Sequence, residues 1–204
     1  AEPAPHREAD TPRPGNAYER SKLAAEHVLA AALAGSPVSW TILRPQGLYG
    51  ADRPATATQF REIAHRRLWV HGPARVAVHP THVADLVAVV ARVLGREDLD
   101  GEVINVGGER SLEFSDLIAL IGRCIGHAPL QFRAPRWTGH AARIAAHGWS
   151  AVGTPPNALT RQARSWINRA VDIDKARRLL GFQPVPLEWG IDQTARALLQ
   201  NGNL

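Results

Sequence analysis

The stretch NAYERSKLAAEHVLAAALAGSPVSWTILRP, residues 16–45, predicts a helix followed directly by a strand. Asn16 is a good helix cap, and Glu19 stands three residues later, as in a capping box. The helix ends near Gly35, and Pro37 follows it closely. VSWTIL is a short apolar run with β-branched residues, which indicates a buried strand. This order is typical of α/β proteins.

The same alternation continues downstream. HVADLVAVVARVL, residues 82–94, is an amphipathic helix pattern, and EVINV, residues 102–106, is a second apolar strand. SLEFSDLIALIGRCIG predicts a further helix with Ser111 as its cap and Gly126 as its end. The remaining chain is mostly helical in pattern. Because only two core strands are visible, we expect an α/β fold whose parallel sheet is incomplete.

Composition narrows the class of protein. The 204 residues are 45% hydrophobic and 21% charged, which excludes a mainly disordered or a collagen-like chain. The single cysteine, Cys124, cannot form an internal disulfide, and no Cys/His array has zinc-finger spacing. The longest Ala/Leu-rich stretch, residues 23–35, is shorter than the roughly 20 residues that a membrane span needs. We expect a cytoplasmic protein with no membrane partner.

The net charge of +5 is unevenly distributed. Residues 117–171 contain no carboxylate, and they contain seven arginines: Arg123, Arg133, Arg136, Arg143, Arg161, Arg164 and Arg169. Such an excess favours an anionic partner, which could be a phosphorylated small molecule, a nucleic acid or an anionic membrane. A GC-rich coding bias explains it equally well, since 22 of the 24 basic residues are arginine. No helix-turn-helix, zinc-finger or RNA-binding signature accompanies the charge, so nucleic acid is the weaker alternative.

Tyr18 and Lys22 form a candidate chemical pair. They lie four residues apart in the first predicted helix, so their side chains share one face. A phenol beside an ammonium group can act as a general acid/base toward a carbonyl or an alcohol. Taken alone, this spacing is usually just a solvated helix surface.

Its context is more specific. YERSK is followed in order by ILRPQGLYG, HPTHVADLV, GEVINVGGE and DKARRLLGFQP. This series resembles the extended short-chain dehydrogenase/reductases, the NAD-dependent epimerase/dehydratase family, over essentially the whole chain. The resemblance implies a Rossmann-like, doubly wound parallel sheet with a smaller, mostly helical substrate-binding lobe. It also implies NAD or NADP as cofactor, a small-molecule substrate that is phosphorylated, such as a nucleotide sugar, and a possible homodimer.

The resemblance assigns roles to individual positions. Tyr18 is expected to be the catalytic acid/base, and Lys22 to activate it and to hydrogen-bond the nicotinamide ribose. The segment expected beside the nicotinamide consists of Pro45, Gln46, Gly47 and Leu48. The residues expected to contact substrate are Tyr49, Arg75 and Arg136. His79 and Asp85 are expected to orient backbone and to fix a helix start. The spacing of His71, His79 and His82 fits no standard metal site, so we expect no metal.

The sequence also departs from the family. It has no Gly-x-x-Gly-x-x-Gly turn before Tyr18, and it lacks the acidic residue that would read the cofactor ribose. We therefore expect the C-terminal portion of a longer enzyme, with only part of the cofactor site. The expected parts are a Rossmann remainder (1–50), a substrate-lobe insertion (51–80), the last Rossmann helix and strand (81–106) and a substrate-binding lobe (107–204). The alternative is a non-catalytic relative that binds a dinucleotide or a nucleic acid.

Overall fold

The computed structural model describes residues 5–65, 68–71, 76–149, 153, 168–202 and 204. The first part of the chain forms α1 (Ala17–Leu33), β1 (Thr41–Pro45), β2 (Leu48–Tyr49), α2 (Pro54–His65), β3 (Leu68–His71), β4 (Ala77–Val78), β5 (Thr81–His82) and α3 (Val83–Val93). A short 3-10 helix, η1 (Glu97–Leu99), follows. The rest forms β6 (Glu102–Val106), β7 (Leu112–Glu113), α4 (Phe114–Cys124), β8 (Leu130–Arg133), α5 (Arg136–Trp149), α7 (Asp174–Leu180) and α8 (Leu187–Gln200).

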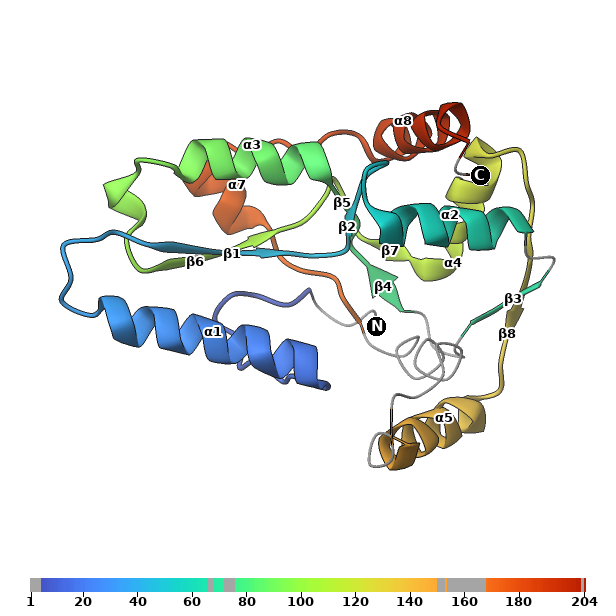
Figure 1. The fold of residues 1–204 in the computed structure, drawn as a ribbon, viewed down its shortest axis with the longest axis horizontal. Helices are drawn as coiled ribbons and strands as arrows, with labels where there is room; N and C mark the ends of the chain where they lie inside the picture. Colours follow the sequence, from blue (N-terminus) through green and yellow to red (C-terminus); the bar gives the residue numbers. More distant parts are fainter. Residues whose placement is uncertain (1–4, 66–67, 72–75, 150–152, 154–167, 203) are drawn as a thin grey trace.

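A parallel pair of strands is the centre of the α/β part. β1 pairs with β6 from Thr41 opposite Glu102 to Pro45 opposite Val106. The helix α1 lies on one side of this pair, and α3 and α7 lie on the other (Figure 1). Three further two-stranded pairs occur in the described residues: β2 with β5, β3 with β8, and β4 with β7. The predicted α/β class with an incomplete parallel sheet is confirmed.

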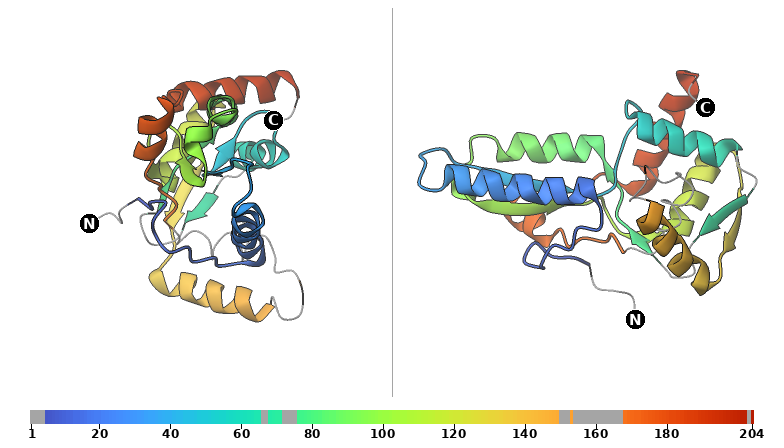
Figure 2. Two further views of the ribbon diagram at one scale, coloured as in Figure 1. Left: turned by 90° about the vertical axis from the view of Figure 1, so that its left-hand side faces the viewer. Right: turned by 60° about the horizontal axis from the view of Figure 1, so that its bottom comes forward.

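The described residues form two hydrophobic cores. The first packs α3 and α7 against β6, and its members are Val89, Leu99, Ile104, Val106, Ile173, Ala176, Leu180 and Phe182. The second joins α2, α4 and α8 into a helical lobe, with Phe60, Ile63, Ile118, Ile121, Leu187, Ile191 and Leu198 among its members. Figure 2 shows the lobe beside the parallel pair, with α5 and α8 at opposite ends of the lobe.

Helix limits follow the sequence signals with one exception. Gly35 and Gly181 adopt the left-handed conformation just after α1 and α7, with φ of +74° and +57°. Ser111 was predicted to cap a helix, but α4 begins at Phe114. The prediction is wrong because residues 112–113 form β7, in which Leu112 pairs antiparallel with Val78. No described helix combines the length and the apolar character that crossing a membrane requires.

Candidate functional site

The first turn of α1 carries the candidate acid/base. Asn16 caps the helix, because its Oδ1 accepts a hydrogen bond of 2.9 Å from the backbone N–H of Glu19. The carboxylate of Glu19 reaches back to the backbone N–H of Gly15 at 2.7 Å. The predicted capping box is therefore present in a modified form, since the carboxylate bonds to the residue before the cap. These two bonds fix the start of α1 and with it the backbone of Tyr18, the second residue of the helix.

Tyr18 and Lys22 lie on one exposed face. The Tyr18 side chain is 67% exposed, and the Lys22 ammonium lies 5.6 Å from the centre of its ring. Because both side chains are open to solvent, a substrate can reach the phenol oxygen without any rearrangement of the core.

The segment Pro45–Leu48 runs from the last residue of β1 to the first residue of β2 and is held by backbone hydrogen bonds. The Gln46 N–H donates to the Val106 carbonyl at 2.9 Å, and the Thr81 N–H donates to the Gly47 carbonyl at 3.2 Å. The Thr81 hydroxyl also donates to the Gln46 carbonyl. Gly47 has a φ of +57°, and a Cβ there would lie 3.0 Å from the His79 carbonyl oxygen, so a larger residue would be strained. The segment is thus a rigid, partly exposed turn.

This turn and the start of α1 lie at the same end of the parallel pair. α1 runs antiparallel to β1, so that its N-terminal end lies toward the C-terminal end of the strand (Figure 1). The C-terminal ends of parallel strands are where open α/β sheets bind their ligands. The structure therefore gathers Tyr18, Lys22 and the Pro45–Leu48 turn at one end of the sheet.

The predicted substrate residues are placed differently. Tyr49 is 7% exposed and belongs to the core of the helical lobe, where its phenol lies against Gly190 and its ring lies edge-on to His82. Burial raises the pKa of Tyr49, and the carboxylates of Asp85 and Glu188 raise it further. This environment gives Tyr49 a packing role, and contact with substrate stays a prediction. Arg136 begins α5, and Arg75 lies outside the described residues.

His79 connects backbone segments. Its Nε2 lies 3.0 Å from the Gly108 carbonyl oxygen, and its Nδ1 lies 3.1 Å from the carbonyl oxygen of Val171. Burial lowers the pKa of His79, so the neutral imidazole is favoured. Gly107 lies directly against this ring, and a Cβ on Gly107 would meet the ring atoms at 2.6 to 2.8 Å. The paired glycines after β6 therefore serve packing in this structure.

His82 and Asp85 fix the start of α3. The Nδ1 of His82 accepts a 3.3 Å hydrogen bond from the Ala84 N–H and caps the helix. Asp85 is buried, and its Oδ1 accepts a 2.9 Å bond from the Val185 N–H, which ties the helix to the segment before α8. Within the described residues, no group of three or more His, Cys, Asp or Glu side chains comes together as a metal site would.

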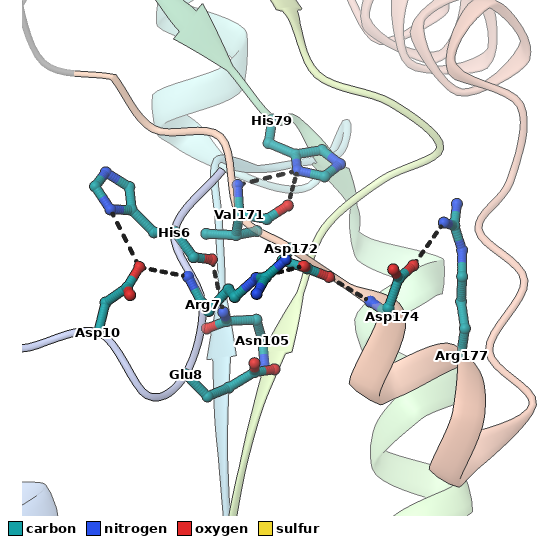
Figure 3. Close-up of polar contacts among 10 residues, drawn as sticks. All are labelled: His6, Arg7, Glu8, Asp10, His79, Asn105, Val171, Asp172, Asp174 and Arg177. Carbon is teal, nitrogen blue, oxygen red and sulfur yellow. Dashed lines mark hydrogen bonds and ion pairs between the residues drawn. The ribbon is translucent and has the colours of Figure 1, made fainter. Parts of the chain in front are cut away.

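A contact that the sequence did not reveal lies at the outer edge of β6 (Figure 3). His6 forms an isolated parallel bridge there with Val171, in the segment before α7. The Asn105 N–H donates to the Glu8 carboxylate at 2.8 Å, and its side-chain amide donates to the His6 carbonyl at 3.2 Å. These partners are separated by 97 and 99 residues, so no local pattern could have revealed them.

Comparison with known proteins adds family information. Residues 1–111 match the family described as RmlD substrate binding domain. An uncharacterised protein of Sinorhizobium fredii is 24% identical over 198 residues, which cover 93% of this chain and 56% of that protein. The UDP-glucose 4-epimerase of Thermotoga maritima, solved with UDP-glucose, has a similar fold (TM-score 0.72, 20% identity, 98% of this chain and 59% of that one).

Two further solved structures share the fold. One is the UDP-glucuronic acid 4-epimerase of Bacillus cereus in complex with UDP-glucuronic acid and NAD (TM-score 0.69, 21% identity, 98% of this chain and 58% of that one). The other is RMD from Pseudomonas aeruginosa in complex with NADPH (TM-score 0.67, 20% identity, 98% of this chain and 60% of that one). The chain therefore spans 56% to 60% of the length of these proteins.

Proposed function

This chain belongs to the RmlD substrate binding domain family, and from that premise we propose that it forms part of an NAD(P)-dependent epimerase, dehydratase or reductase of the extended short-chain dehydrogenase/reductase class. The fold agrees with that class, since the similar solved structures include two nucleotide-sugar epimerases. The proposed substrate is a nucleotide sugar or a related alcohol or ketone.

One observation carries the proposal. The Tyr18 phenol is 67% exposed in the first turn of α1, with the Lys22 ammonium 5.6 Å from its ring, at the ligand-binding end of a parallel strand pair. A tyrosine kept only for packing would bury its ring, as Tyr49 does. The exposed phenol is instead available to exchange a proton with a bound molecule.

The chemistry follows from these two side chains. As an alcohol carbon is oxidised, its hydroxyl proton passes to the deprotonated Tyr18 oxygen, and the hydrogen on carbon leaves as a hydride. Bound NAD(P) supplies the acceptor for that hydride. The Lys22 ammonium stabilises the phenolate before the transfer, and Tyr18 returns the proton when a carbonyl is reduced. The rigid Pro45–Leu48 turn supports one wall of the reaction space.

The residues of this chain fit one part of the cofactor. The Lys22 ammonium and the backbone of the Pro45–Leu48 turn suit the nicotinamide and its ribose. The sequence holds no glycine-rich turn before Tyr18 that could cradle the pyrophosphate. We therefore assign only the nicotinamide end of the site to these residues.

The substrate assignment rests on two supports. The similar solved structures include one determined with UDP-glucose and one with UDP-glucuronic acid. The arginine excess over residues 117–171 suits the diphosphate of such a molecule, because arginine binds phosphate through two hydrogen bonds. Arg75 and Arg136 remain the proposed phosphate contacts. A homodimer and a cytoplasmic location remain predictions.

The test is turnover of candidate nucleotide sugars by the native polypeptide that carries these residues, followed through NAD(P)H absorbance or product analysis. We expect Tyr18→Phe to lower kcat by about 10² to 10⁴-fold, the contribution typical of general acid/base catalysis. Dinucleotide affinity should change little. A non-catalytic binding protein would bind the dinucleotide equally well with either residue and would show no turnover with wild type.

A further inference from the structure

We propose that residues 6–10, here called the strap, position Tyr18 for its reaction by fixing the N-terminal end of α1. The strap lies beside the segment that leads into α7 (Figure 3). The His6 N–H donates to the Ala170 carbonyl at 2.8 Å, and the Asp172 N–H donates to the His6 carbonyl at 2.8 Å. The Arg7 guanidinium adds an ion pair of 3.2 Å with Asp172. The strap is therefore held to this segment by a one-residue bridge at His6 and by the Arg7 side chain, and residues 7–10 form a turn.

Glu8 anchors the strap to the sheet. Asn105 lies in β6 and is 4% exposed, so its backbone N–H needs a partner within the protein. That partner is the Glu8 carboxylate at 2.8 Å. Removing the carboxylate would leave a buried donor without an acceptor, which strongly favours movement of the strap or entry of water.

The helix needs this anchor because its packing is shallow. None of the residues of α1 is buried. An ion pair of 2.6 Å between Glu26 and Arg44 ties the middle of the helix to β1. Glu26 lies eight residues after Tyr18, which is about 12 Å along a helix at about 1.5 Å per residue. A small rotation about that tie would move the first turn by an ångström or more.

The link from the strap to Tyr18 is short and stiff. Residues 11–15, TPRPG, join the strap to the helix cap at Asn16. The two prolines fix their φ angles and limit the conformations of this link. A displaced strap therefore displaces Tyr18, and an error of about 1 Å in a catalytic group can cost about 10²-fold in rate. Glu8 is in these terms a positioning residue.

This inference rests on the proposed function, so its test has one readout that needs no turnover. The variants are Glu8→Ala, which removes the acceptor, and Glu8→Gln, which keeps an acceptor oxygen at the same place. The matched control is Asp98→Ala, which removes an exposed ion pair between Asp98 in η1 and Arg96 just before it. Each variant is examined by amide hydrogen exchange, by thermal unfolding and by steady-state kinetics.

We expect Glu8→Ala to speed amide exchange at Glu19 and Arg20 at least tenfold, because both amides bond to Asn16 at the helix start. Exchange in α8 should not change, and kcat should fall 10- to 100-fold with KM within threefold of wild type. Glu8→Gln should restore both readouts, and Asp98→Ala should match wild type in both.

Three results would overturn the inference. Exchange at the start of α1 could stay unchanged in Glu8→Ala, or it could rise equally in α1 and α8, which would indicate a general loss of stability. Faster exchange in α1 with unchanged kcat would show that the strap is structural only. If wild type itself shows no turnover, the proposed function fails, and the exchange data still decide whether the strap holds the helix.

Discussion

Gly107→Ala tests the close contact between Gly107, which follows β6, and the ring of His79. The added Cβ would lie 2.6 Å from Cε1 of His79 and 2.8 Å from each of its ring nitrogens. The ring cannot swing away freely, because its nitrogens lie 3.0 Å and 3.1 Å from the carbonyl oxygens of Gly108 and Val171. Gly107 has no positive φ, so the predicted effect comes from the ring contact alone.

The size of the effect can be estimated from these contacts. Overpacking of a well-packed site typically costs about 1–3 kcal/mol. Displacing the ring also weakens the one hydrogen bond that a neutral imidazole can donate to these carbonyl oxygens, which is worth about 1 kcal/mol. We therefore expect a loss of about 2–4 kcal/mol in the free energy of unfolding, measured by urea titration with circular dichroism. Gly148→Ala is the control, since a Cβ there would have no atom within 4 Å.

A double-mutant cycle identifies the cause. Combining Gly107→Ala with His79→Ala removes the ring that the new methyl would strike. The combined loss should therefore be smaller than the sum of the two single losses by at least about 1 kcal/mol. A Gly107→Ala protein within about 0.5 kcal/mol of wild type, or strictly additive losses in the cycle, would refute this account of the contact.

Two further predictions concern stability. Burial lowers the pKa of His79 in the folded protein, so the unfolded chain binds more protons than the folded chain below about pH 6.5. The stability that the neutral His79 ring contributes is therefore complete above that pH and is lost as the pH falls toward the folded pKa. We expect His79→Gln to flatten the pH dependence of the unfolding free energy between about pH 5 and 7. Phe182 is 2% exposed in the core beneath β6, so Phe182→Ala should cost about 3–5 kcal/mol in urea unfolding, whereas Leu199→Ala, at a side chain 51% exposed, should cost less than about 1 kcal/mol.

Local signals in the sequence were sufficient for most elements. The cap at Asn16 and the end of the helix near Gly35 depend on a few neighbouring residues, and both predictions are confirmed. The prediction that Ser111 caps a helix was wrong because a distant partner determines the local structure there: Leu112 pairs with Val78 in another part of the chain. A competing strand contact thus overrode a good capping residue.

Side-chain environments depend on contacts that a linear pattern does not contain. The motif RPQGLYG identifies the turn after β1, but the burial of Tyr49 depends on Gly190 in α8. The bond from Asn105 to Glu8 joins residues 97 positions apart, and Glu8 belongs to none of the motifs in the sequence. The Tyr18–Lys22 spacing was visible, whereas the strap that holds its helix became visible only in the folded chain.

The most direct test of the proposed function compares wild type with Tyr18→Phe in hydride transfer between NAD(P) and a nucleotide sugar, using the native polypeptide that carries these residues. The exposed phenol contributes little packing, so both proteins should unfold at nearly the same urea concentration. We predict turnover by wild type, a loss of about 10² to 10⁴-fold in kcat for the variant, and unchanged dinucleotide affinity. Equal turnover by the two proteins would contradict the role given to Tyr18, and dinucleotide binding without turnover by wild type would contradict the enzyme assignment.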